Sequence, residues 1–232
     1  MQRSARPLSR SNLLQKFDCC RTIFMCCDIQ EKLRHRIPNF QAAVEVSNAM
    51  ASIHTIMTPT HSTFVATEQY PVGVGRLVQD IKLPAGAPVI EKVQPSMLVP
   101  EMMPYINGDA ERGILPVGQA VLWGHETHVC VLQTADDLLS RGIRVAVLVD
   151  GCASQQSLDH DVAVREMATW NHLMLTTAAS ALMQLSRGDP AVMKKAMKML
   201  RASSVNLSCL VNLPARGGEA EAEKSAGKNF QK

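Results

Sequence analysis

The sequence predicts one α/β domain, built on a parallel β-sheet with helices on both of its faces. Short apolar runs alternate with longer helix-prone segments along most of the chain, which is typical of βαβ units. The short runs are continuously apolar instead of alternating apolar and polar residues, as expected of strands that are buried on both faces. The length of 232 residues suits a single domain with tails.

The first half of the chain supplies three of the expected strands. An apolar run at 22–28 ends in an acid, and a long segment at 40–57 carries apolar residues at helical spacing. A second strand is expected at 62–66, followed by a loop that Pro71 marks. A short third strand at 88–92 ends in a lysine.

The second half continues the alternation. An apolar run at 117–123 lies between a proline and a glycine, and a helical pattern follows until Gly142, where a helix would end. The remaining expected elements are strands at 143–149 and 173–175 and helices at 157–170, 178–185 and 190–201. In a parallel sheet of this kind, ligands bind outside the carboxyl ends of the strands, where the strand order reverses.

The composition argues against several classes of function. The chain is 46% apolar, yet it has no apolar run long enough to span a membrane. Its net charge is +3, its basic residues are scattered and 4% of its residues are aromatic, so no nucleic-acid partner is expected. No Gly-x-Gly-x-x-Gly motif opens a helix, so a dinucleotide site has no residues to form it.

The cysteines indicate a reducing compartment. Seven are present, which is an odd number, and the sequence shows no secretory signal. Two adjacent pairs, at 19–20 and 26–27, lack the Cys-x-x-Cys spacing of a zinc site. We therefore expect free thiols in a cytoplasmic or mitochondrial protein that is not secreted.

Both ends of the chain differ in composition from the domain expected at 13–205. Residues 1–12 contain three arginines and no acidic residue, which fits either a mitochondrial targeting segment or a disordered tail. Residues 206–232 are expected to form a flexible tail, because the stretch from Gly217 onward is small, charged and without aliphatic periodicity.

Cys130 would lie in the first turn of the helix that follows the fourth strand. In that position unpaired N–H groups and the helix dipole stabilise a thiolate, and they lower a cysteine pKa below its free value of roughly 8.5. A buried structural cysteine also fits this position, because cysteine is among the most buried residue types. Both interpretations stay open on these residues alone.

Asp28, Lys92 and Cys130 follow or end three different expected strands. The carboxyl ends of parallel strands share one edge, so an acid, an amine and a thiol would meet there. Lys92 could stabilise a thiolate by its charge, and Asp28 could accept the thiol proton and return it to a leaving group. The structural alternative is a Lys–Asp pair that only neutralises two buried charges.

Six short motifs, in order along the chain, resemble those of the isochorismatase-like cysteine hydrolases. They are CDIQEK at 27–32, TEQYP at 67–71, EKVQPSM at 91–97, GHETHVCV at 124–131, TADDL at 134–138 and VDGCAS at 149–154. The branch that the chain resembles most is that of the isochorismatase domain-containing proteins. Some kinetoplastid relatives in this family carry the label of a mitochondrial-associated ribonuclease.

The resemblance implies a six-stranded parallel sheet of order 3-2-1-4-5-6 in a three-layer α-β-α fold, with Asp28, Lys92 and Cys130 as catalytic triad. Cys130 would be the nucleophile and Asp28 the general base, while Lys92 would polarise the thiol and orient the substrate. The N–H groups of Glu126 and Cys130 would form the oxyanion hole, after a non-proline cis peptide between His125 and Glu126. A homo-oligomer, dimeric or larger, is also implied.

Two departures from the family pattern concern the pocket. Nicotinamidases of the family carry an Asp-x-His metal site where this chain reads Thr-Glu-Gln at 67–69, so we expect no metal, no cofactor and a substrate other than nicotinamide. Leu33 stands where many members place a phenylalanine, which affects pocket shape. The residues expected to line the pocket are Gln30, Glu68, Gln69, Tyr70, Ser96 and His128.

The expected function is hydrolysis of a small amide or related C–N bond by a cysteine nucleophile, through a thioester. One alternative is a non-catalytic, oligomeric interaction module on the same fold. A ribonuclease is the other alternative, and the residues give it little support, because they indicate no basic groove, no histidine pair for acid–base catalysis and no acidic metal cluster.

Overall fold

A computed structural model describes residues 12–58 and 60–202. Its centre is a six-stranded sheet of order β3-β2-β1-β4-β5-β6, in which every neighbouring pair is parallel. The strands are β1 (Thr22–Cys27), β2 (Ser62–Gln69), β3 (Val89–Lys92), β4 (Gln119–His125), β5 (Arg144–Ala153) and β6 (Leu173–Thr176). The predicted sheet and strand order are confirmed.

The strand order reverses between β1 and β4. From β1 the chain proceeds to β2 and β3 on one side, and it then crosses to β4, β5 and β6 on the other. Every residue of β1 and β4 is buried, which explains why these segments are almost continuously apolar. The carboxyl ends of these two central strands flank the place where ligands bind in sheets of this type.

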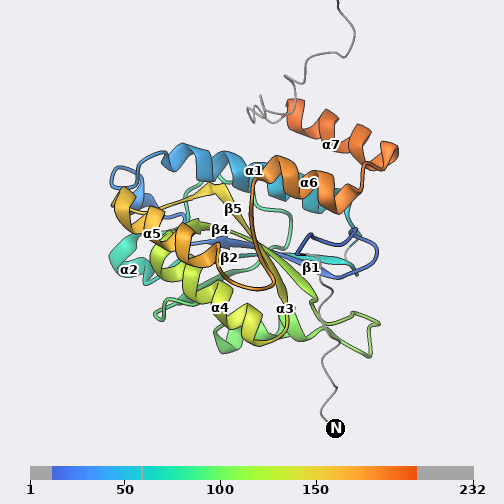
Figure 1. The fold of residues 1–232 in the computed structure, drawn as a ribbon, viewed down its shortest axis with the longest axis horizontal. Helices are drawn as coiled ribbons and strands as arrows, with labels where there is room; N and C mark the ends of the chain where they lie inside the picture. The colour runs from blue at the N-terminus through green and yellow to red at the C-terminus, as the bar shows by residue number, and fades with distance from the viewer. Residues whose placement is uncertain (1–11, 59, 203–232) are drawn as a thin grey trace, which may run out of the picture.

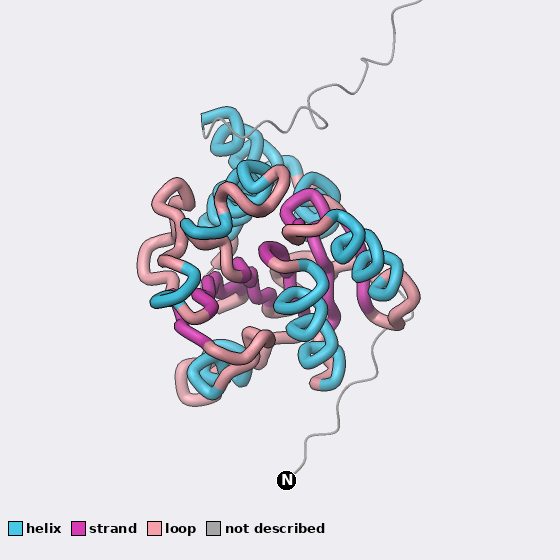
Figure 2. The backbone as a smooth tube through the Cα atoms, turned by 90° about the vertical axis from the view of Figure 1, so that its left-hand side faces the viewer, coloured by secondary structure: helices cyan, strands magenta, loops and turns pink. Residues whose placement is uncertain are grey.

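Helices cover both faces of the sheet and form three layers with it. The helices are α1 (Phe40–Ile56), α2 (Pro71–Val74), α3 (Met103–Asn107), α4 (Leu132–Ser140), α5 (Ser157–Met167), α6 (Ala178–Ser186) and α7 (Pro190–Ala202). Three short turns join them: η1 (Glu31–Leu33), η2 (Pro100–Met102) and η3 (Thr127–Val131). Figure 1 shows α1, α6 and α7 above the sheet and α3 and α4 below it, and Figure 2 shows the strands enclosed by helices.

β2 and β5 run three or more residues further than the sequence predicted. β2 continues through 67–69, because these residues pair with β3 on one side while residue 67 still pairs with β1 on the other. β5 continues through 150–153, because its register against β4 shifts after Leu122 and Cys152 then pairs with Gly124. Both extensions lie at the carboxyl edge of the sheet. There, hydrogen bonding to a neighbouring strand keeps polar residues and a glycine in the strand, although they are not typical strand residues.

The last three helices pack on the rest of the domain. α7 packs against α1 within its own chain, and its Ala196 is fully buried. In α5, Ala163 and Met167 lie one turn apart and are buried, whereas Val162 is 53% exposed. Thr177 caps α6 by accepting a hydrogen bond from Ser180 N–H.

The predicted tails at 1–12 and 206–232 lie outside the described residues, apart from Asn12. The domain predicted at 13–205 is described as far as residue 202. No helix in the described part of the chain is long and apolar enough to cross a membrane.

β1 and β4 approach each other closely at their carboxyl ends. Gly124 pairs with Cys27 and has a φ of 130°, a conformation that side chains rarely adopt. A Cβ atom at Gly124 would lie 2.0 Å from the carbonyl oxygen of Cys27. Glycine is therefore required where the two strands deliver Asp28 and the turn that carries Cys130.

Gly124→Ala is expected to lower the free energy of unfolding by about 3 kcal/mol or more, because it adds a backbone clash to a strained φ. Gly86→Ala is the matched control. Gly86 also has a positive φ, of 77°, but nothing lies within 4 Å of its added Cβ, so a loss of about 1 kcal/mol is expected. Urea unfolding of both variants measures the difference, and equal losses would contradict the role given to the strand contact.

Candidate active site

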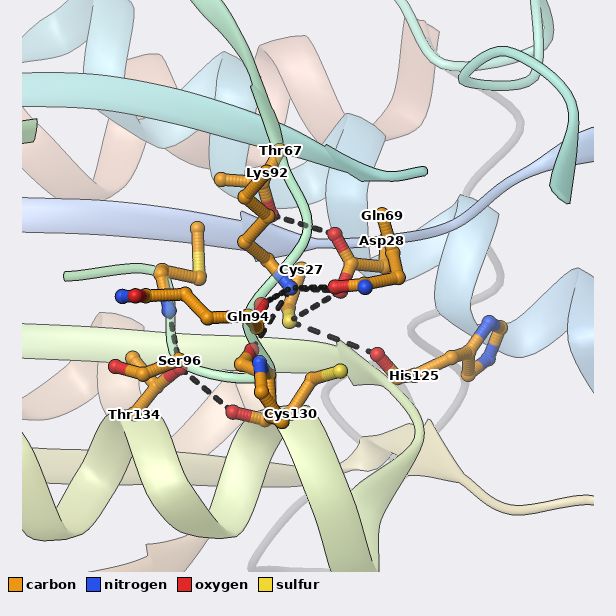
Figure 3. A network of polar contacts seen from close by, with 12 residues as sticks. Cys27, Asp28, Thr67, Gln69, Lys92, Gln94, Ser96, His125, Cys130 and Thr134 are labelled. Atoms are coloured by element: carbon orange, nitrogen blue, oxygen red, sulfur yellow. Dashed lines mark hydrogen bonds and ion pairs between the residues drawn. The ribbon is translucent and has the colours of Figure 1, made fainter. Parts of the chain in front are cut away.

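A buried ion pair joins the end of β3 to the residue that follows β1. The Lys92 Nζ donates to Asp28 Oδ2 at 2.7 Å, and the two side chains are 0% and 2% exposed (Figure 3). The pairing depends on β2, which lies between these strands and sets their separation. Two members of the predicted triad are thus brought into direct contact.

The Lys92 ammonium is saturated by protein acceptors. Besides Asp28, it donates to Gln69 Oε1 at 2.8 Å and to the carbonyls of Pro95 at 2.8 Å and Gln94 at 3.3 Å. Burial alone lowers the pKa of Lys92, but the ionisable groups of its neighbours, Asp28 among them, outweigh burial and raise that pKa overall. Lys92 therefore remains a fixed positive charge at neutral pH.

The Asp28 carboxylate has partners on both oxygens. Thr67 Oγ1 donates to Oδ1 at 2.8 Å, and Oδ2 accepts from Lys92 and, at 3.5 Å, from the Cys27 thiol. The backbone of Asp28 has a φ of 51°, a left-handed conformation that aspartate tolerates better than most residues. This conformation ends β1 and turns the chain at the strand end.

Cys130 lies in η3, a π-helical turn, and α4 begins two residues later at Leu132. The sequence predicted the first turn of an α-helix, which is wrong in type although the strand-to-helix position is right. Such π turns are rare in proteins as a whole, and those that occur are often found at functional sites. Thr134 anchors the turn by donating to the Cys130 carbonyl at 2.6 Å and accepting from Met97 N–H at 2.9 Å. The predicted cis peptide between His125 and Glu126 is confirmed.

A second thiol, Cys27, adjoins Cys130 (Figure 3). Burial, the interaction with Cys130 and the charge of Asp28 raise the pKa of Cys27 well above its usual value. Burial also raises the pKa of Cys26 and of Cys152 to about 12. These three cysteines therefore remain thiols at neutral pH and are poor nucleophiles.

The structure places two of the expected pocket residues in contact with other protein groups. The Gln69 amide is shared between Lys92 and the carbonyl of Val93, to which it donates at 2.6 Å. Gln30 donates to the Gln69 carbonyl at 3.0 Å and accepts from its N–H at 2.8 Å. Gln30 thus fixes Gln69, and Gln69 in turn fixes the Lys92 ammonium.

The other four expected pocket residues are spread around this centre. Glu68 is buried and accepts from Arg76 and from Leu77 N–H, which directs it away from Asp28. Three more flank the site: Tyr70 is 54% exposed beyond β2, Ser96 is buried and accepts from Leu98 N–H, and His128 is partly exposed beside Ser154.

His125, at the end of β4, is fully buried, and its ring lies 5.1 Å from that of Phe40. Neither ring nitrogen has a hydrogen-bond partner among the described residues. Burial lowers the pKa of His125 to about 3, so the imidazole is neutral in the folded protein. Figure 3 shows its ring directed away from Cys130, while its carbonyl accepts from the Cys27 thiol at 3.5 Å.

A cavity of about 500 Å³ is separate from the ion pair. The N-terminus of α1, the end of β5 and the N-terminus of α5 line it, and none of Asp28, Lys92 or Cys130 does. Within 12–58 and 60–202, no group of three or more His, Cys, Asp or Glu side chains is placed to hold a metal ion.

Sequence reasoning missed several residues that shape the site. Thr67 was read as the start of a loop, although its place one residue beyond a predicted strand was a usable signal. Thr134 sits one helical turn after Cys130, which is the spacing of a hydroxyl that bonds a carbonyl four residues back. Of the residues that contact 126–128, Ser154 ends the VDGCAS motif, whereas Gln155 and His160 gave no local signal.

Comparison with known proteins identifies the family and agrees with the fold. Residues 22–180 match the family model described as the isochorismatase domain. The chain is 36% identical, over 165 residues, to isochorismatase domain-containing protein 1 of Salmo salar. That match covers 71% of this chain and 55% of the salmon protein, so the chain spans about half the length of this relative.

Two solved structures share both sequence and fold with the chain. A hypothetical protein of Trypanosoma cruzi is 42% identical with a TM-score of 0.77, covering 82% of this chain and 96% of that one. A Leishmania major protein named "putative MAR1 ribonuclease" is 36% identical with a TM-score of 0.73, and it covers the same shares of the two chains. The kinetoplastid resemblance expected from the sequence is thereby confirmed.

Lys92→Met is expected to lower the free energy of unfolding by about 3–5 kcal/mol, because it leaves the buried Asp28 carboxylate without its charge partner. The double variant Asp28→Asn/Lys92→Met removes both charges and should lose clearly less than the sum of the two single losses. Urea unfolding at pH 7 of the wild type, the two single variants Lys92→Met and Asp28→Asn, and the double variant completes this double-mutant cycle. Additive losses would contradict a coupled pair.

Stability should fall in acid partly through His125. The unfolded histidine binds a proton below about pH 6.5, whereas the folded one does not until about pH 3, so acid favours unfolding by about 1.4 kcal/mol per pH unit in between. His125→Gln should flatten the pH dependence of the free energy of unfolding between pH 6.5 and 4. Parallel curves for wild type and variant, measured by urea unfolding, would contradict a neutral buried imidazole.

Proposed function

The chain belongs to the isochorismatase family, and from this premise we propose that it is a cysteine-dependent hydrolase of a small amide or a related C–N bond. The observation that carries the proposal is the buried ion pair of Asp28 and Lys92 at the strand edge that also holds Cys130. A carboxylate, a fixed ammonium and a thiol at the switch point of a parallel sheet suit nucleophilic catalysis.

In the first step, Asp28 takes the Cys130 proton and the thiolate attacks the carbonyl carbon of the amide. The Lys92 charge favours the thiolate by Coulomb attraction, in a setting that excludes water and weakens screening. The new C–S bond pushes the carbonyl electrons onto oxygen. The N–H groups of Glu126 and Cys130 are the proposed donors to this oxyanion.

In the second step, the tetrahedral intermediate collapses and the C–N bond breaks. Protonated Asp28 gives its proton to the departing nitrogen, which leaves as ammonia or an amine. Asp28 then deprotonates a water molecule that attacks the thioester, releasing a carboxylic acid and regenerating the Cys130 thiol. Atoms and charges balance without a cofactor or metal.

The contacts of Lys92 refine its proposed role. Four protein oxygens surround its ammonium, which has three protons to donate, so none is left for a substrate carbonyl in this arrangement. Lys92 thus serves as a fixed charge that orients Asp28 and stabilises the Cys130 thiolate. Gln69 and Gln30 are positioning residues of this charge, and Ser96, Tyr70 and His128 remain the proposed contacts of the substrate.

The name of the Leishmania relative makes ribonuclease activity the second candidate, and an inactive oligomeric module is the third. The net charge of +3 supplies little attraction for RNA. RNA cleavage that Cys130→Ala abolishes would favour the second candidate over the first. A homo-oligomer is compatible with all three and stays a prediction.

Cys130 is expected to react with iodoacetamide at pH 6.5 at least about tenfold faster than the exposed Cys19, because a thiolate is the nucleophile. The Asp18 carboxylate, by its hydrogen bond, raises the pKa of Cys19 and keeps that thiol protonated. Mass spectrometry of alkylated peptides measures each cysteine separately. Equal rates for the two residues would argue strongly against an activated nucleophile.

Hydrolysis is tested with a panel of small primary and secondary amides, by release of ammonia or amine. Cys130→Ala should abolish turnover, and Asp28→Asn should lower it at least about 100-fold as loss of the general base. Cys19→Ser is the matched control, since it removes an exposed thiol and should leave turnover unchanged. Turnover that survives Cys130→Ala would exclude the proposed chemistry.

A further inference from the structure

One segment, residues 154–160, holds the turn that leads to Cys130. Three consecutive residues of that turn each bind it by a side chain. The Glu126 carboxylate accepts from Gln155 N–H at 2.9 Å and from its Nε2 at 2.7 Å. Thr127 Oγ1 hydrogen-bonds to His160 Nδ1 at 2.9 Å, and His128 Nδ1 hydrogen-bonds to Ser154 Oγ at 2.9 Å.

The 154–160 segment is itself firmly placed. It begins where β5 ends, at Ala153, which pairs with His125 at the end of β4. Ser154 is 1% exposed, and α5, which starts at Ser157, packs on β5, β6 and η3. The segment thus transfers the rigidity of two strands and a helix to the turn that would supply the oxyanion hole.

These contacts are distinct from the contacts of the charged groups. Asp28 and Lys92 are bound by Thr67, Gln69 and the carbonyls at 94 and 95, from β2, β3 and the loop after β3, and by the Cys27 thiol at the end of β1. The 154–160 segment comes from the opposite half of the sheet, and its side-chain hydrogen bonds to the turn go to residues 126–128. One network therefore surrounds the charge, and the other surrounds the backbone N–H groups.

We propose that Gln155 and His160 are positioning residues, which hold Glu126 and Thr127 so that the N–H groups of the turn face the oxyanion. This inference rests on the proposed function. Donors to an oxyanion act only within about 2.7–3.1 Å of it, so a displacement of the turn by about 1 Å weakens this stabilisation severely. The thiolate, by contrast, depends on the Asp28 and Lys92 charges, which the segment leaves in place.

The test uses two reagents that share a nucleophile and differ in transition state. Iodoacetamide alkylates Cys130 by displacement at carbon and forms no oxyanion. p-Nitrophenyl acetate acetylates Cys130 through a tetrahedral intermediate whose oxygen needs the donors. Peptide mass spectrometry at pH 7 gives both rates for Cys130 in the full-length protein.

Thr127→Val keeps the shape of the residue and removes its hydroxyl, and Thr127→Ser keeps the hydroxyl as the matched rescue. Gln155→Met keeps the chain length and removes the Nε2 donor at an exposed position, where folding tolerates the change. For Thr127→Val and Gln155→Met we expect acetylation of Cys130 to fall at least about tenfold, with alkylation within about twofold of wild type. Thr127→Ser should retain most of the acetylation rate.

Three results would overturn the inference. Unchanged acetylation in both variants would mean that the segment does not position the turn. Equal losses of acetylation and alkylation would mean that the segment acts through the fold or the thiolate, and urea unfolding of the same variants would show which. If wild-type Cys130 reacts with neither reagent faster than Cys19, the proposed function fails first, and this inference fails with it.

Discussion

The buried ion pair between Asp28 and Lys92 is the interaction on which the rest of the site depends. Two charges at 2.7 Å with almost no exposure are tolerated only when each is matched by a partner and further hydrogen bonds. Thr67 satisfies the second carboxylate oxygen, and Gln69 satisfies part of the ammonium. All these groups stand at strand ends. The buried charges and their hydrogen bonds are therefore located at the edge where the sheet would bind its ligand.

The sheet supplies this arrangement through its switch point. β1 and β4 are neighbours at the centre of the sheet, and the strand order runs from them in opposite directions. Gly124 lets the carboxyl ends of these two strands come within contact distance. The chain therefore delivers Asp28 from one strand and the Cys130 turn from the other to the same place. Lys92 arrives from two strands away, and its long side chain covers that distance to reach the carboxylate.

Two hydrogen-bond networks support the candidate site, and they share no side chain. One fixes the charges from the β2–β3 half of the sheet, and the other fixes residues 126–128 from the β5–α5 half. A nucleophile needs charge stabilisation of its thiolate, whereas an acyl intermediate needs backbone donors. Because the two networks are separate, the charged groups and the backbone N–H groups are each held by different side chains. A substitution in one network should therefore leave the other network intact.

The sequence by itself determined the sheet type, the strand order through the family resemblance, and the residues at three strand ends. Burial on both faces forces apolar runs that can be read locally, and Asp28 and Lys92 stand out because charge interrupts them. The sequence alone could not determine that Gln30 and Gln69 form hydrogen bonds within the protein instead of lining an open pocket. Nor could it determine that β2 runs through residue 69 or that Gln155 binds Glu126. These partnerships depend on register and on distances between segments far apart in the chain, and only the tertiary structure sets those.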